Sequence, residues 1–157
     1  MTSNEKLIHS FYQAFQNKDY VTMQNCYAEK AEFSDNVFQH LDSLQVKKMW
    51  EMLIKKSTDL KIEVGNIQAD ESNGSAEWIA SYTFSKTNRK VINRVKAKFT
   101  FDQGKIVKHT DRFNFYKWSG QALGFLGVIL GWSPLVKNKV RHEAMNNLNQ
   151  FIAKNAS

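Results

Sequence analysis

The chain has 157 residues, the length of a single domain, and 42% of them are hydrophobic, which is enough for a packed core. Its net charge of +7 favours anionic partners in general. The single cysteine, Cys26, excludes an internal disulfide, and no cluster of Cys and His has the spacing of a zinc site. The first residues lack the features of a signal peptide, and no stretch reaches the ~18 apolar residues of a membrane span, so we expect a cytoplasmic protein.

Three amphipathic helices are predicted in the first part of the chain. Apolar residues recur at helical spacing over residues 4–17, 20–27 and 43–57. Between the second and third helix, residues 31–35 are expected to be short and irregular, with Phe33 pointing inward.

From residue 60 onward the apolar period changes to two, which predicts β-strands. Gly65 marks a phase shift typical of a β-bulge, and Asn73 with Gly74 predicts a hairpin turn. Further turns are expected at residues 87–88 and 102–104. Three helices followed by a long antiparallel meander predict an α+β fold, in which the helices cover one face of a curved sheet and enclose a cavity.

The last strand carries two titratable groups on its apolar side. Residues 101–118 open with a turn and then alternate, so His109 and Asp111 point the same way. Burying such groups costs free energy unless they are paired or used. Two interpretations stay open: an acid–base pair that contacts a ligand, or a structural pair that bonds to Asn93, Tyr82 or the backbone.

Residues 117–157 are interpreted as a helical extension. Glycines interrupt an apolar run over residues 122–132, and Ser133 with Pro134 is typical of a helix start. The run is expected to dock onto the protein's own body, because large exposed apolar patches are rare on soluble monomers. A lid, a partner surface and contact with a membrane surface stay open as alternatives.

Three segments carry a resemblance to a known family. They are Leu7–Asp19, Tyr27–Asp35 with its sequence YAEKAEFSD, and the FDQGKI hairpin at Phe101–Ile106. Together they resemble the nuclear transport factor 2-like superfamily, in its branch of SnoaL-like polyketide cyclases and steroid isomerases. The resemblance implies a cone-shaped, cystatin-like fold with an apolar pocket, formed by a domain over residues 1–116, with the extension 117–157 packed on it.

The resemblance also implies roles for individual residues. Asp35 stands where the isomerases have their general base. Their oxyanion donors are missing, because Phe11 and Ala97 stand at about those positions. Steroid isomerisation is therefore disfavoured. In the cyclases the acid–base residue lies on the last strand, which favours Asp111 with His109 beside it.

These arguments select nine candidate site residues. The catalytic candidates are Asp111, His109 and Asp35, and the ligand-binding candidates are Tyr12, Trp50, Trp78, Tyr82, Asn93 and Phe113. No metal or cofactor is expected. The function favoured is binding of a small hydrophobic molecule, with acid–base catalysis of the cyclase, isomerase or dehydratase type on an apolar carbonyl compound as its sharper form. The alternative is a non-catalytic ligand-binding or protein-interaction module.

The outer face of the sheet is predicted to be basic. Its stripe comprises Arg94, Lys96, Lys98, Lys108 and Arg112. It lacks interleaved aromatic residues on which bases could stack, so nucleic-acid binding is not expected. A row of like charges opposes self-association through this face, although a homodimer stays open.

Overall fold

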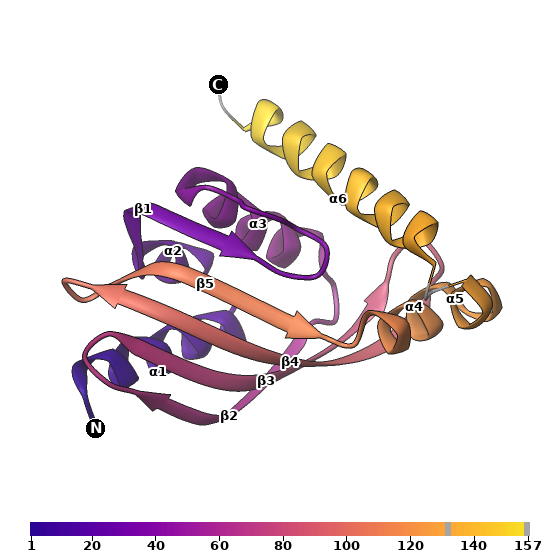
Figure 1. The fold of residues 1–157 in the computed structure, drawn as a ribbon. Coiled ribbons are helices and arrows are strands. Elements are labelled where there is room, and N and C mark those ends of the chain that lie inside the picture. Colours follow the sequence, from indigo (N-terminus) through magenta and orange to yellow (C-terminus); the bar gives the residue numbers. More distant parts are fainter. Residues whose placement is uncertain (131–132, 156–157) are drawn as a thin grey trace.

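A five-stranded sheet with helices against it forms the body of the protein (Figure 1). The computed structural model describes residues 1–130 and 133–155. The elements in chain order are α1 (Ser3–Gln16), α2 (Tyr20–Asn25), β1 (Tyr27–Ser34), α3 (Ser43–Lys56), β2 (Lys61–Ala69), β3 (Asn73–Phe84), β4 (Arg89–Asp102), β5 (Lys105–Phe113), α4 (Phe115–Leu123), α5 (Phe125–Leu130) and α6 (Pro134–Lys154). The α+β fold class and the three N-terminal helices are confirmed.

Strands β2 to β5 form the predicted antiparallel meander, and β1 adds a parallel strand beside β5. The prediction of an irregular segment at residues 31–35 is therefore wrong. The reason lies in the register, which shifts between Tyr27 and Glu32, so that β1 has no regular alternation for a sequence pattern to reveal. Phe33 is fully buried, as predicted, and stands opposite His109.

Two boundaries differ from the sequence prediction. The β2–β3 turn comprises residues 70–72 and precedes Asn73 and Gly74, which belong to β3. The Asp70 carboxylate stabilises this turn, because it accepts hydrogen bonds from the amides of Ser72 and Asn73 at 2.8 and 2.7 Å. Strand β5 ends at Phe113 and does not continue to residue 118. The side chain of Asn114 accepts a bond from the Lys117 amide and caps α4, which stops the strand. The bulge after Gly65 is confirmed.

The core fills the inner face of the sheet. Helix α1 packs on β2 and β3, α3 packs on β1, and α6 packs on α3. Leu148 of α6 is fully buried and belongs to this core. A second cluster forms where α4 meets β4, and its buried members are Val91, Phe115, Trp118 and Ala122. The helices after β5 thus extend the hydrophobic interior that the sheet begins.

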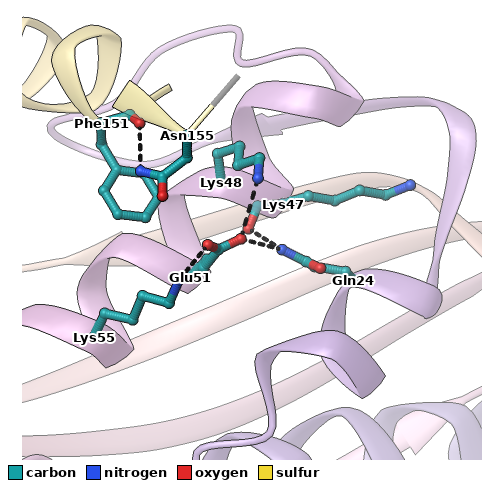
Figure 2. Close-up of polar contacts among 7 residues, drawn as sticks. All are labelled: Gln24, Lys47, Lys48, Glu51, Lys55, Phe151 and Asn155. Carbon is teal, nitrogen blue, oxygen red and sulfur yellow. Dashed lines mark hydrogen bonds and ion pairs between the residues drawn. The ribbon is translucent and has the colours of Figure 1, made fainter. Parts of the chain in front are cut away.

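A polar network joins α2 to α3 (Figure 2). Glu51 of α3 is only 6% exposed, and its carboxylate accepts bonds from Lys48 at 3.3 Å, Lys55 at 2.8 Å and Gln24 of α2 at 3.4 Å. The ammonium group of Lys55 also lies 5.8 Å from the centre of the Phe151 ring of α6. Burying a carboxylate is tolerable here because several donors surround it.

The apolar run of the extension is only partly docked. Ala122 is buried, whereas Phe125 and Val128 are exposed. Gly131 and Trp132, which end the run, lie outside the described residues. None of the described helices is long and apolar enough to cross a membrane.

Two glycines on neighbouring strands should respond oppositely to replacement by alanine. A Cβ atom at Gly74 would lie 2.8 Å from both Ile8 Cδ1 and the Phe101 ring, whereas a Cβ atom at Gly65 would meet nothing within 4 Å. Gly74→Ala should therefore lower the free energy of unfolding by about 1–3 kcal/mol. Gly65→Ala should change it by less than about 1 kcal/mol, in the stabilising direction. Urea unfolding of both variants measures the difference, and equal losses would contradict the packing at Gly74.

Candidate active site

A cavity of about 380 Å³ opens between the inner face of the sheet and helices α3, α4 and α6. Seven of the nine candidate residues line it: Asp35, Trp50, Trp78, Tyr82, Asn93, Asp111 and Phe113. Two candidates do not. His109 lies behind Asp111 and is 1% exposed, and Tyr12 is buried in the core against the rings of Phe11 and Trp78. Most of the lining is apolar. Three carboxyl groups interrupt it, those of Asp35, Asp111 and Glu143, and Glu143 is paired with Lys86.

Four side chains form a continuous hydrogen-bonded chain that ends at the cavity. Trp50 Nε1 lies 2.9 Å from Tyr27 Oη, which lies 2.8 Å from His109 Nδ1. His109 Nε2 lies 2.8 Å from Asp111 Oδ1. Of the partners considered for a structural pair, neither Asn93 nor Tyr82 bonds to it among the described residues. The Tyr82 hydroxyl accepts a bond from Trp118 instead, at 2.8 Å, and Tyr27 takes the expected place beside the histidine.

One arrangement of protons gives each of these four side chains its hydrogen-bond partner. The indole of Trp50 can only donate, so Tyr27 Oη accepts that bond and donates its own proton to His109 Nδ1. The proton of the neutral imidazole then sits on Nε2 and is donated to Asp111. Burial raises the pKa of the Tyr27 hydroxyl well above its ordinary value, and the nearby Asp111 charge adds to this, so the phenol keeps its proton. The result is a carboxylate held in one orientation.

Asp35 reaches the same cavity from the loop after β1. Its Oδ1 atom accepts bonds from the amides of Val37 at 2.7 Å and Phe38 at 2.6 Å. Burial raises the pKa of Asp35 from 3.8 to about 7. The two amide bonds oppose this rise, whereas the negative charge of Asp111 reinforces it. Near neutral pH this carboxyl group can therefore carry a proton.

Two residues that the sequence did not single out hold the Asp35 loop. The side-chain amide of Asn36 forms two bonds of 3.0 Å with the backbone of Phe113, which attaches the loop to the end of β5. Arg141 of α6 donates to the Asn36 carbonyl oxygen at 2.9 Å. No sequence signal could reveal these contacts, because they join residues 77 and 105 positions apart. Tyr27, in contrast, opens one of the family-like segments and could have been found there.

Two buried polar atoms remain without partners. Within the part of the chain that the structure describes, Tyr12 Oη and Trp78 Nε1 have no hydrogen-bond partner.

At the cavity rim, Lys86 forms an ion pair with Glu143 of α6. Among the described residues, no group of three or more His, Cys, Asp or Glu side chains is arranged to hold a metal ion.

Comparison with known proteins places the chain in a family. Residues 8–109 match the family described as SnoaL-like domain. The chain belongs to this family. No curated protein matches the sequence.

Solved structures of low sequence identity share the fold. An epoxide hydrolase of the LEH-like type from M. tuberculosis is 18% identical, with a TM-score of 0.62 over 85% of this chain and 95% of that one. A proposed polyketide cyclase from Pseudomonas putida is 19% identical, with a TM-score of 0.64 over 78% and 98%. AclR, a proposed hydroxylase from Streptomyces galilaeus, is 22% identical, with a TM-score of 0.62 over 83% and 97%. The predicted SnoaL-like, nuclear transport factor 2-like fold is confirmed.

Two buried tyrosines should respond differently to loss of their hydroxyl groups. Tyr27→Phe leaves both Trp50 Nε1 and His109 Nδ1 without a partner, which should lower the free energy of unfolding by about 1–3 kcal/mol. Tyr12→Phe removes a buried hydroxyl that bonds to no described residue, so stability should stay equal or rise. Chemical denaturation of the two variants gives the comparison, and a destabilised Tyr12→Phe variant would show that its hydroxyl has a partner.

The raised pKa of Asp35 predicts a pH-dependent stability. Between pH 3.8 and about 7 the folded state holds a proton that the unfolded state has lost, so the free energy of unfolding falls as the pH rises through this window. At about 1.4 kcal/mol for each pH unit, the full penalty is of the order of 4 kcal/mol. Asp35→Asn keeps the amide bonds without the charge and should be more stable than the wild type above pH 7. Melting curves from pH 4 to 8 test this, and parallel curves would contradict the raised pKa of Asp35.

Proposed function

We propose that this SnoaL-like protein is an acid–base enzyme that acts without a cofactor on an apolar carbonyl compound bound in the cavity. One observation carries the proposal: two carboxyl groups in different environments, Asp111 and Asp35, line one apolar cavity. Pairs of carboxyl groups whose surroundings separate their protonation states are typical of acid–base sites. The solved structures of similar fold, which include proposed polyketide cyclases, support the same class of chemistry.

Asp111 acts as the base in this proposal. Its Oδ1 atom is occupied by His109, which leaves Oδ2 for the substrate. The carboxylate takes a proton from a carbon next to the carbonyl group, and the electron pair of the broken C–H bond moves into an enolate. The neutral imidazole keeps the carboxylate oriented during this transfer.

Asp35 acts as the acid. Because its Oδ1 atom accepts two amide bonds, the proton belongs on Oδ2, from which it is donated to the developing enolate oxygen. In a cyclase the enol carbon then attacks a second carbonyl carbon, whose oxygen takes the proton from Asp111 while the enol oxygen returns its proton to Asp35. In an isomerase Asp111 returns the proton to another carbon, and the enol oxygen again returns its proton to Asp35. The rings of Trp50, Trp78 and Phe113 provide the apolar walls that exclude water and bind the substrate.

Exchange of carbon-bound hydrogen for deuterium tests the base directly. Apolar ketones and β-keto esters are incubated with the protein in D₂O, and NMR follows the hydrogens next to the carbonyl group. Asp111→Asn still accepts the His109 bond, so it should fold normally, yet it should lower the exchange rate by about 10²–10⁴-fold. The exposed Glu63→Gln on β2 is the matched control and should exchange like the wild type.

Affinity and pH dependence separate catalysis from binding. Asp111→Asn should bind the ketones as tightly as the wild type, measured by tryptophan fluorescence, because the apolar walls are unchanged. The wild-type exchange rate should fall as the pH rises through about 7, where Asp35 loses its proton. Equal exchange by wild type and Asp111→Asn, with ligand binding retained, would instead favour a non-catalytic ligand-binding module of the same fold.

A further inference from the structure

An exposed apolar patch gathers at one end of the molecule. It comprises Tyr116, Phe125, Val128 and Leu135, which are 45%, 77%, 51% and 79% exposed. Figure 1 shows their elements, α4, α5 and the start of α6, at the same end of the molecule. The Tyr116 hydroxyl donates to the Val128 carbonyl oxygen at 3.0 Å, which fixes α4 against α5. Large apolar side chains that stay exposed in a group indicate a contact with something outside the chain.

The same segment is purely basic. Residues 115–142 contain Lys117, Lys137, Lys139 and Arg141 and no Asp or Glu. Lys117 and Lys139 are exposed. Arg89, the first residue of β4, joins this group, because its Nε atom donates to the Gln121 carbonyl oxygen at 2.8 Å. The segment that carries the apolar patch thus also carries positive charge and has no acidic residue of its own to neutralise it.

We infer that this patch binds the surface of a membrane that contains anionic lipids. A second copy of the chain would bring two basic patches face to face, which opposes a symmetric contact. Anionic headgroups complement the lysines, while Phe125 and Leu135 enter the acyl boundary, and stable attachment of peripheral proteins needs both contributions. Tyr116 is of the aromatic type that is enriched at the membrane interface.

The patch lies beside the cavity. Trp118 and Leu123 of α4 and Val140 of α6 line the cavity wall, and they belong to the same segment as the patch. A protein attached through this end would hold its cavity close to the lipid, where apolar molecules concentrate. The attachment itself does not depend on the proposed catalysis.

Sedimentation with vesicles tests the inference on the full chain. Vesicles of phosphatidylcholine alone are compared with vesicles that also contain phosphatidylglycerol, at low and high salt. The wild type should bind the anionic vesicles at low salt, bind less at high salt, and bind the neutral vesicles weakly. Phe125→Ser with Leu135→Ser should lower the affinity for the anionic vesicles by at least about tenfold. Lys117→Gln with Lys139→Gln should lower it by about thirtyfold and leave the binding to neutral vesicles unchanged.

Leu44→Ser is the matched control. Leu44 is 56% exposed at the start of α3, next to Ser43, whose hydroxyl bonds to the Ala28 carbonyl oxygen of β1. This variant should bind like the wild type. Melting temperatures confirm that all variants are folded. No binding of the wild type to anionic vesicles at low salt overturns the inference, and so does equal loss in Leu44→Ser. A third outcome would assign the patch to contact with a second copy of the chain. In that case the wild type would not bind vesicles, and analytical ultracentrifugation would show a dimer that Phe125→Ser abolishes.

Discussion

The parallel pairing of β1 with β5 determines which side chains meet at the inner end of the cavity. It sets Phe33 opposite His109 and brings the hydroxyl of Tyr27 within 2.8 Å of the imidazole. The loop that follows β1 then carries Asp35 to the cavity that Asp111 lines. Without this strand, His109 would be a buried ring with an acceptor atom left unpaired, and the meander alone would hold one carboxyl group instead of two. The proposed chemistry therefore depends on the pairing of two strands that are far apart in the sequence.

The two carboxyl groups differ because their hydrogen-bond donors differ. Asp111 accepts a hydrogen bond from an imidazole that a phenol and an indole hold in one tautomer. Asp35 accepts hydrogen bonds from two backbone amides, but its desolvation outweighs them and the Asp111 charge adds to the effect, so its pKa rises to about 7. Each group influences the other, which means that replacing one of them changes the protonation of its neighbour as well as removing its own function.

Local periodicity was sufficient to predict the helices, the meander and the inward direction of His109 and Asp111, because these features depend on residues two to four positions apart. It was insufficient for β1, whose register shift between Tyr27 and Glu32 hides the alternation. It also missed the partner of His109, since Tyr27 lies 82 positions away. The end of β5 depended on a single capping side chain, Asn114, which outweighed the apolar alternation that continues through Phe115. The family resemblance pointed to Asp35 and Asp111, and the aromatic pattern pointed to rings that line the cavity, but neither could supply the contacts that hold these residues.

The orientation of the apolar run was the hardest feature to predict, because composition does not tell which side of a short helix faces the core. In α5, Gly127 determines which side packs against the protein. A Cβ atom at Gly127 would collide with the backbone of Ser119, so only glycine lets α5 lie directly against α4. With that glycine side of α5 used for packing, Phe125 and Val128 are left exposed. Helix α4 consequently has two roles: Trp118 and Leu123 line the cavity, and Tyr116 belongs to the exposed patch. A change that loosens the contact between α4 and α5 should therefore alter the cavity and the surface together, which couples access to the carboxyl groups with whatever binds at this end of the protein.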